Sequence, residues 1–302
     1  MRSAELFGRN HTDLGAIAAV AEGPAAIAIC RGGAAKTYAY TDPNEDAAFF
    51  AVGPGGLMAA VADGHHGARG AEEIVRWLCA QRAPAWTALH GEANDPGAWA
   101  EHASALIRDA HAAILEQAHA LGVAPAPTTL SCVLVRPRDG LLVHASIGDS
   151  HTFVVAGDRS EIAEDGSAVA NDRSAAGDAR SATRDLGWAS AGRRRPFFLG
   201  EPFERGAPED DQYIAGCEPL AGVTVIVLAT DGLSERRIGV PDPAATVREC
   251  VRRARAASPA LRPLEACRNV TEAALAAHRA NRSGDNIAAA VLWLSEAARE
   301  AR

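Results

Sequence analysis

Four aspartates stand at the boundaries of apolar, strand-like runs, and their carboxylates are the groups of this chain best suited to chemistry: Asp63, Asp149, Asp231 and Asp285. A carboxylate at the end of a buried strand is held on a rigid element and points at a rim or cleft. Converging carboxylates repel one another unless a cation neutralises them, and Mg²⁺ and Mn²⁺ are hard divalent cations that prefer oxygen ligands. The pattern predicts a metal site with several carboxylates and, as its chemistry, metal-assisted hydrolysis.

Any one of these aspartates taken alone is more simply explained as a turn or cap residue, because Asp-Gly pairs are common in turns. Glycine does follow Asp63 and Asp231. The joint pattern favours the metal site, since all four aspartates border strand-like runs and a further acidic pair, Glu45 and Asp46, precedes another such run.

The strands and helices that must position these groups are predicted from hydrophobic periodicity. Apolar runs separated by short turn segments predict two antiparallel hairpins, with strands at 47–52 and 57–62 and at 130–136 and 142–147. Further strands are expected at 25–30, 152–156, 223–230 and 287–294. Helical spacing predicts helices over 70–81, 98–121, 243–257 and 261–280.

This succession of elements indicates the fold class. Hairpin-linked strands, then helices, then more strands are typical of an α+β fold. Two helix pairs and about eight to ten strands fit a layered sandwich, in which sheet packs on sheet and helices lie outside. We expect residues 1–24 to form a loosely structured lead-in, 157–217 an irregular loop or small subdomain, and 296–302 a charged tail.

Composition excludes some classes of function. The 302 residues carry a net charge of -8, which argues against nucleic-acid binding through a basic face and against an anionic membrane surface. None of the six cysteines forms a C-x-x-C pair, so buried free thiols in a reducing cytosol are expected. The first residues lack the apolar core of a secretory signal, and the apolar stretch 14–29 is too interrupted to span a bilayer. We therefore predict a cytoplasmic protein with no nucleic-acid or membrane partner.

Five short motifs occur in an order and at spacings that resemble the metal-dependent protein phosphatases of the PPM, or type 2C, family, with its bacterial members as the nearest type. The motifs are Asn44-Glu45-Asp46, Val61-Ala62-Asp63-Gly64-His65-His66-Gly67, Ile147-Gly148-Asp149-Ser150, Leu228-Ala229-Thr230-Asp231-Gly232-Leu233 and Gly284-Asp285-Asn286. Each is weak alone, but together they form a specific signal over residues 25–295, which we expect to be a single phosphatase domain. The resemblance implies an αββα four-layer sandwich of two packed, mainly antiparallel sheets flanked by helix pairs.

The resemblance also implies a function and its cofactors. Family members hydrolyse phosphoserine and phosphothreonine in phosphorylated protein substrates, and so act in signalling by dephosphorylation. Their centre holds two Mn²⁺ or Mg²⁺ ions per subunit. A hydroxide that bridges the two ions attacks phosphorus, and no covalent enzyme intermediate is needed.

Ligand roles carry over to the matching positions of this chain. Asp63 would bridge the two ions, and Asp231 and Asp285 would complete the shell of the first ion. The ligands of the second ion would be the backbone carbonyl of Gly64 and the side chains of Glu45 and Asp46.

Two further positions match functional residues of the family. Asp149 stands where bacterial members can hold a weaker third ion. His65 matches the general acid that protonates the leaving alkoxide, and its place directly after Asp63 and Gly64 favours this role over that of a solvated or structural histidine. His66 has no such counterpart, and we expect it to be structural or adjacent to the substrate.

The chain departs from the family pattern near the acidic pair. Family members often carry an arginine there that grips the substrate phosphate, and Tyr40 and Thr41 occupy those positions in this sequence. The nearest upstream cations are Lys36 and Arg31, and the spacing does not show whether either reaches inward. In the irregular segment, Arg193-Arg194-Arg195 is either a solvated loop or a docking patch for an acidic or phosphorylated partner.

Three functions are consistent with this sequence. The leading hypothesis is an active phosphoprotein phosphatase. A catalytically degenerate member that binds phosphoprotein or metal without turnover is favoured by the missing arginine but disfavoured by the complete set of carboxylates. A phosphohydrolase for small molecules is the third. The sequence identifies neither the substrate protein and its pathway nor the oligomeric state.

Overall fold

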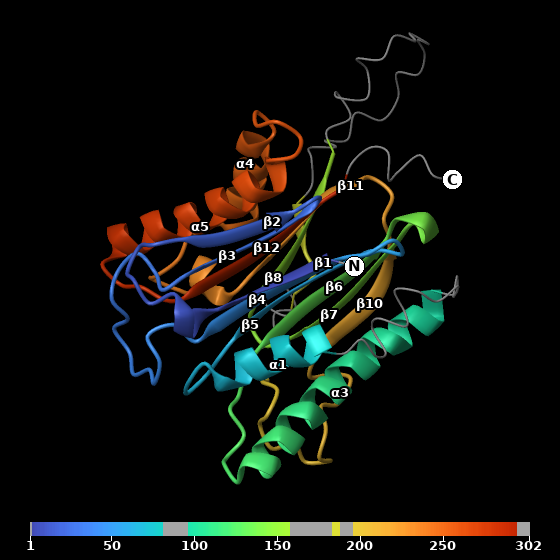
Figure 1. Ribbon diagram of the computed structural model, residues 1–302, viewed down its shortest axis with the longest axis vertical. Coiled ribbons are helices and arrows are strands. Elements are labelled where there is room, and N and C mark those ends of the chain that lie inside the picture. Colours follow the sequence, from blue (N-terminus) through green and yellow to red (C-terminus); the bar gives the residue numbers. More distant parts are fainter. Residues whose placement is uncertain (1, 81–95, 158–182, 188–195, 295–302) are drawn as a thin grey trace.

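The computed structural model describes residues 2–80, 96–157, 183–187 and 196–294, which fold into two β-sheets packed face to face (Figure 1). The first sheet has the strand order β1 (Arg2–Phe7), β4 (Asp46–Val52), β5 (Leu57–Asp63), β6 (Leu130–Arg136), β7 (Leu141–Ile147), β10 (Ile214–Pro219). The second has the order β2 (Ala18–Glu22), β3 (Ala25–Cys30), β12 (Ile287–Trp293), β11 (Val223–Ala229), β8 (His151–Ala156), β9 (Thr183–Asp185). Every pairing between these neighbouring strands is antiparallel.

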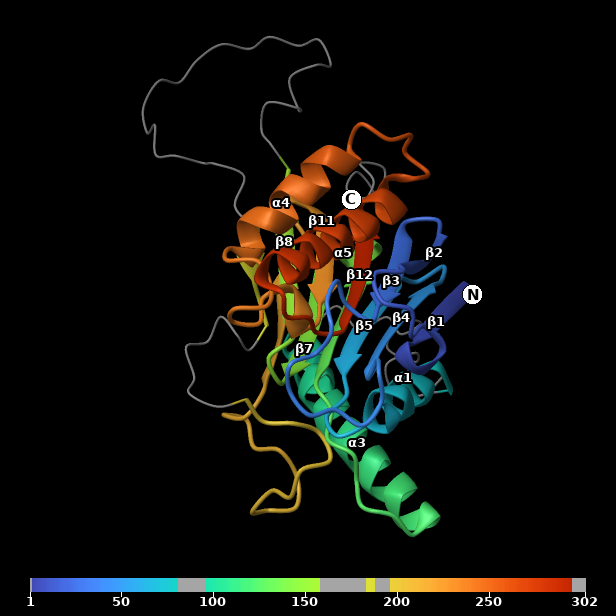
Figure 2. The same cartoon turned by 90° about the vertical axis from the view of Figure 1, so that its left-hand side faces the viewer.

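Helices cover the outer face of each sheet (Figures 1 and 2). The helices α1 (Arg69–Ala80) and α3 (Pro96–Leu121) pack on the first sheet, and α4 (Pro243–Ala254) and α5 (Arg262–Asn281) pack on the second. The predicted α+β class and the αββα four-layer sandwich are therefore confirmed.

Both faces of the central strands are buried, and this explains their nearly continuous apolar sequences. Successive residues of a strand point to opposite faces. In β4, Ala48 and Phe50 join the core between the two sheets together with Ile27 of β3, whereas Phe49 packs with Ile74 of α1 in the core beneath the helices.

The two predicted hairpins are confirmed. The strands β4 and β5 pair on either side of a turn closed by a hydrogen bond from Gly53 N to Gly56 O of 3.0 Å. The strands β6 and β7 are joined by a short 3₁₀ turn that ends at Gly140, whose φ of 64° lies in the left-handed region that glycine tolerates.

The expectation of a loosely structured lead-in was wrong, because residues 2–7 and 18–22 form the strands β1 and β2. Each lies at the edge of its sheet and mixes exposed with partly buried positions. An edge strand of this kind is stabilised by pairing with its neighbour along one side. Its own sequence lacks the apolar run by which a central strand is predicted.

The segment 157–217 also contains regular structure that periodicity did not predict. The three-residue strand β9 pairs with β8, and the six-residue strand β10 pairs with β7, so that each extends one of the two sheets. With these strands and the two edge strands, the described residues contain twelve strands rather than eight to ten. Arg193-Arg194-Arg195 and the charged tail lie outside the described residues.

No helix within the described part of the chain is long and apolar enough to cross a membrane. None of the six cysteines, all of which lie in the described ranges, forms a disulfide with another; Cys79 and Cys217 are partly buried and the other four are buried.

Candidate metal centre

The predicted aspartates lie at strand ends that meet at one rim of the sandwich. Asp46 begins β4 and Asp63 ends β5, and the two residues are direct partners in the antiparallel register. Asp231 follows β11, and Asp285 comes just before β12, the partner of β11 in the second sheet. Because the end of one antiparallel strand lies beside the start of the next, each strand pair brings two carboxylates to the same edge.

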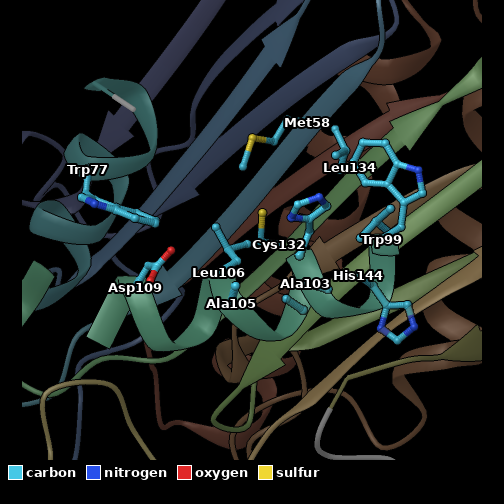
Figure 3. Close-up of a pocket in the computed structure, with 13 residues that line it drawn as sticks. Met58, Trp77, Trp99, Ala103, Ala105, Leu106, Asp109, Cys132, Leu134 and His144 are labelled. Carbon is cyan, nitrogen blue, oxygen red and sulfur yellow. The ribbon is translucent and has the colours of Figure 1, made fainter. Parts of the chain in front are cut away.

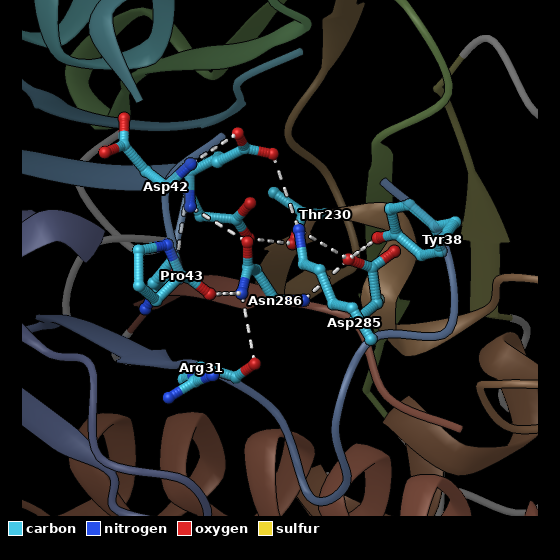
Figure 4. A network of polar contacts seen from close by, with 12 residues as sticks. Arg31, Tyr38, Asp42, Pro43, Thr230, Asp285 and Asn286 are labelled. Carbon is cyan, nitrogen blue, oxygen red and sulfur yellow. Dashed lines mark hydrogen bonds and ion pairs between the residues drawn. The ribbon is translucent and has the colours of Figure 1, made fainter. Parts of the chain in front are cut away.

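A threonine joins the two halves of this carboxylate cluster. The Thr230 hydroxyl donates to Asp46 Oδ2 at 2.7 Å and accepts from the backbone N–H of Ala288 at 2.9 Å. Thr230 directly follows β11 of the second sheet and Asp46 begins β4 of the first, so this hydrogen bond links the two sheets within the site (Figure 4).

Burial and mutual repulsion raise the pKa values of the carboxylates. The pKa of Asp46 rises to about 7, first through burial and then through the charge of Asp285. The pKa values of Asp63 and Asp231 also lie well above the usual range, through burial first and then through neighbouring aspartates. The protein thus holds several acids where each is harder to ionise than in water.

Asn286 positions the loop that carries the acidic pair. Its side-chain oxygen accepts from the backbone N–H of Glu45 at 2.8 Å, and its amide nitrogen donates to the carbonyls of Arg31 and Pro43, each at 3.0 Å (Figure 4). Glu45 Oε1 in turn accepts the backbone N–H of Thr41 at 3.0 Å. The loop before β4 is thereby tied to the strand that follows Asp285.

Two glycines beside the predicted ligands cannot carry a side chain. A Cβ at Gly64 would lie 2.6 Å from the carbonyl oxygen of Glu45, and a Cβ at Gly232 only 1.7 Å from that of Asn286. In both places one strand-end loop packs directly on the backbone of another. Glycine after Asp63 and after Asp231 is therefore required by the close approach of backbones.

His65 and Asp149 also lie close to Asp63. One ligand atom from each of these three residues lies within 4.8 Å of the others, a grouping that can hold a metal ion. His65 Nε2 is buried with no hydrogen-bond partner among the residues that the structure describes, and its ring meets Phe198 edge-on with centroids 4.1 Å apart. Burial lowers the pKa of His65 more than the charge of Asp149 raises it. His66 is exposed.

The donor set fits hard divalent cations. Carboxylates dominate it, and two of their buried oxygens, Asp46 Oδ1 and Asp149 Oδ1, have no hydrogen-bond partner in the described part of the chain. A buried carboxylate oxygen without a partner is costly unless a cation compensates it. Oxygen ligands suit Mg²⁺ and Mn²⁺ better than softer metals.

Two loop residues of this site, Lys36 and Tyr38, could not be assigned from the sequence. The spacing left open whether Lys36 reaches inward, and Tyr38 was not recognised at all. The Lys36 ammonium lies 3.3 Å from Asp285 Oδ1 and 3.5 Å from Glu45 Oε2, and the Tyr38 hydroxyl donates to Asp285. Arg31 is turned elsewhere, because its guanidinium donates to the carbonyl of Thr12 at 3.0 Å. Loop residues have no periodicity to reveal their direction; the only available signal was that Lys36 is a cation close in sequence to an acidic pair.

A separate hollow lies between α1, α3 and the first sheet (Figure 3). Its lining is mostly apolar, with Trp77, Trp99 and Leu106 from the helices and Met58 and Cys132 from the sheet. None of the predicted ligands lines it. The predicted ligands therefore lie at the strand ends and not in this hollow.

The profile of the family described as "Protein phosphatase 2C" matches residues 35–278. No curated protein matches the chain significantly.

Solved structures similar to the whole chain include three serine/threonine phosphatases. The serine-threonine phosphatase 2C of Toxoplasma gondii has a TM-score of 0.60 at 18% identity, covering 93% of this chain and 99% of that one. Stp1 of Staphylococcus aureus has a TM-score of 0.55 at 16% identity, covering 94% and 98%. PstP/Ppp of Mycobacterium tuberculosis has a TM-score of 0.55 at 18% identity, covering 93% and 99%. At these identities the similarity establishes the shared fold.

Proposed function

Because the chain belongs to the protein phosphatase 2C family, and is thus a serine/threonine phosphatase, we propose that it hydrolyses phosphoserine and phosphothreonine in proteins with the help of divalent metal ions. The observation that carries the metal dependence is the carboxylate cluster. Burial and mutual repulsion raise the pKa values of Asp46, Asp63 and Asp231, and within the described ranges some of the buried oxygens have no hydrogen-bond partner. Groups held in so unfavourable a state are typical of functional sites.

We propose the following ligands for Mn²⁺ or Mg²⁺. Asp63, Asp231 and Asp285 would hold the first ion. The carbonyl of Gly64 and the side chains of Glu45 and Asp46 would hold the second, to which Asp63 would also contribute. When bound, such ions lower the pKa of a water molecule to produce a nucleophile near neutral pH and offset negative charge on the phosphoryl oxygens. Asp149, beside Asp63, is the candidate ligand of a weaker third ion.

His65 is the proposed general acid. Its Nε2 has no hydrogen-bond partner in the described structure and is free to hold a proton for the leaving alkoxide. Phe198 packs against the ring and limits its rotation, and the backbone N–H of His65 donates to the carbonyl of Pro127 at 2.8 Å. These contacts support a fixed orientation of the imidazole next to Asp63.

The test is hydrolysis of a phosphothreonine peptide by metal-stripped protein with and without added Mn²⁺. We expect release of phosphate only with Mn²⁺, and its loss in Asp231→Asn. The matched control is Asp211→Asn, which makes the same chemical change at an exposed position and should retain activity.

Other outcomes would select another function. Calorimetric Mn²⁺ binding without phosphate release would indicate a binding module without turnover. Release from small phosphate esters but from no phosphopeptide would indicate a small-molecule phosphohydrolase. Hydrolysis that persists in Asp231→Asn would contradict the proposed metal site.

A further inference from the structure

Lysine occurs once in this chain, at position 36, and every other member of its 30 lysines and arginines is arginine. The two side chains differ physically. Arginine carries a broad and rigid planar charge, whereas lysine carries a compact ammonium with three donors on a flexible four-carbon stem. Position 36 is therefore the one place in the chain with a compact cation on a flexible stem. The residues around it indicate what this cation does.

Lys36 is inserted into the carboxylate cluster. Its side chain is only 5% exposed, and its ammonium lies 3.3 Å from Asp285 Oδ1 and 3.5 Å from Glu45 Oε2. The carboxylates on either side of the ammonium offset the cost of burying its charge and hold the side chain among them. Of the lysines and arginines within the described ranges, it is the one that forms ion pairs with the proposed ligands.

Two tyrosines border the ammonium. Its nitrogen lies 5.2 Å from the ring centre of Tyr38 and 5.7 Å from that of Tyr40, within the range of cation–π attraction. Tyr38 also donates its hydroxyl to Asp285 (Figure 4). Both rings are about two-fifths exposed, at 44% and 42%, so they lie at the solvent side of the site. Lys36 thus has carboxylates on one side and an accessible aromatic border on the other.

The carboxylates that Lys36 contacts are proposed ligands of two different metal ions, Asp285 of the first and Glu45 of the second. The ammonium lies within 3.5 Å of both oxygens. It therefore fills space that a divalent ion would need and neutralises part of the negative charge that would attract such an ion. The ammonium and the metal ions therefore compete for the same oxygens. Once metal neutralises these carboxylates, their hold on the lysine weakens, while a dianionic phosphoryl group is a strong acceptor for its donors.

We propose that Lys36 is a shared cation of the site: its ammonium competes with divalent ions for Glu45 and Asp285 and, when those carboxylates bind metal, binds the phosphoryl oxygens of the substrate. This inference rests on the proposed function and adds a residue that recognises the phosphate. It also gives a physical basis for coupling, because metal binding releases the group that then binds phosphate.

The test is calorimetric titration of metal-stripped protein with Mn²⁺, and of Mn²⁺-loaded protein with inorganic phosphate. Lys36→Met should bind Mn²⁺ about tenfold more tightly, since a competing charge is gone. It should bind phosphate roughly 10- to 100-fold more weakly, since a charged hydrogen bond is lost. Lys36→Arg should retain most phosphate binding. Arg31→Gln is the matched control, because this loop cation faces Thr12, and neither affinity should change.

A second measurement needs no variant. Because the chain has one lysine, an amine reagent such as trinitrobenzenesulfonate labels a single ε-amino group, which peptide mass analysis separates from the α-amino group. Saturating Mn²⁺ should speed labelling of Lys36, and added phosphate should slow it again. A labelling rate unchanged by Mn²⁺, or Mn²⁺ and phosphate affinities of Lys36→Met equal to those of the wild type, would overturn the inference.

The outcomes separate this inference from the proposed function. If the wild-type protein binds no Mn²⁺ and hydrolyses no phosphopeptide, the proposed function itself fails. If it binds Mn²⁺ and hydrolyses the peptide, but Lys36→Met has wild-type affinities and Mn²⁺ does not change the labelling rate of Lys36, only the proposed role of Lys36 is wrong.

Discussion

Two polar networks lie near the strand ends where β8 begins and β11 ends, and they are built on opposite principles. In the first, the carboxylate cluster, like charges converge, and some oxygens have no hydrogen-bond partner in the part of the chain that the structure describes. In the second, which we call the His151 chain, His151 Nδ1 lies 2.6 Å from Asp185 Oδ2 and His151 Nε2 lies 2.5 Å from Ser234 Oγ. Asp185 Oδ1 accepts two further backbone N–H groups, those of Thr152 and Gly187.

This difference in hydrogen bonding indicates that the His151 chain serves stability and the carboxylate cluster serves function. A satisfied buried network stabilises a fold, whereas an unsatisfied one costs free energy and is retained where it has a use. The His151 chain contains the residue types of a hydrolytic triad. We assign it a structural role, because it ties the short strand β9 to the turn after Asp231 and Ser234 also lies 3.4 Å from the carbonyl of Asp231.

The largest expected effect comes from removing one charge of the cluster. Asp63→Asn should lower phosphatase activity by more than about 100-fold, the upper end for groups that merely orient metal ligands. Without metal, the same variant should unfold at higher urea concentration than the wild type, because repulsion from Asp46 and Asp285 is relieved. Peptide hydrolysis and urea titration measure the two effects, with Asp211→Asn as control. A variant that loses both activity and stability would show that Asp63 is structural.

The pH dependence of stability should also separate the networks. Asp46 has a pKa of about 7 in the folded protein, against an ordinary value of 3.8. Between these values the folded state binds more protons than the unfolded state, so stability falls as pH rises from about 4 to about 7. The loss should be on the order of 3 kcal/mol for metal-free protein.

Urea unfolding of metal-free protein at pH 5 and pH 8 measures this slope. Asp46→Asn should flatten it, whereas Asp211→Asn should leave it unchanged. Equal stability of the wild type at both pH values would mean that the carboxylates do not repel one another as their arrangement indicates.

Breaking the His151 chain should cost stability and leave catalysis nearly intact. In His151→Phe the new ring can keep the stacking on Phe153, whose centroid lies 5.1 Å away, but both hydrogen bonds are lost. We expect a loss of about 1–3 kcal/mol, because Asp185 remains largely buried with fewer partners. His151→Gln should recover part of it, since an amide can donate to Asp185 and accept from Ser234. A large loss of kcat in well-folded His151→Phe would give this network a role in catalysis.

The smallest effect is expected for Ser234→Ala. This substitution removes one neutral hydrogen bond to His151, and Ser234 is only partly buried. The free energy of unfolding should fall by about 1 kcal/mol, with activity within a few-fold of the wild type. Urea titration and peptide hydrolysis measure both. An increase in stability would contradict our description of this network as satisfied.

Much of the fold could be predicted from sequence because central elements carry their own signals. The strands β3, β4, β5, β6 and β11 are apolar on both faces, and α1 and α5 place apolar residues at helical spacing. The four edge strands, β1, β2, β9 and β10, lack such signals. They exist because a neighbouring strand offers hydrogen bonds, and that neighbour is distant in sequence for β1, β9 and β10.

The sequence by itself determined the acidic residues of the candidate site, since carboxylates at strand ends and glycines beside them are local patterns. It also determined that these strand ends would be rigid. Only the tertiary structure decided which polar groups meet them. Lys36 enters the cluster while Arg31 turns to Thr12, and His151 joins Asp185 to Ser234. The reason is physical: the direction of a loop side chain is set by charges and backbone groups brought near by the fold of distant segments, and no local periodicity encodes it.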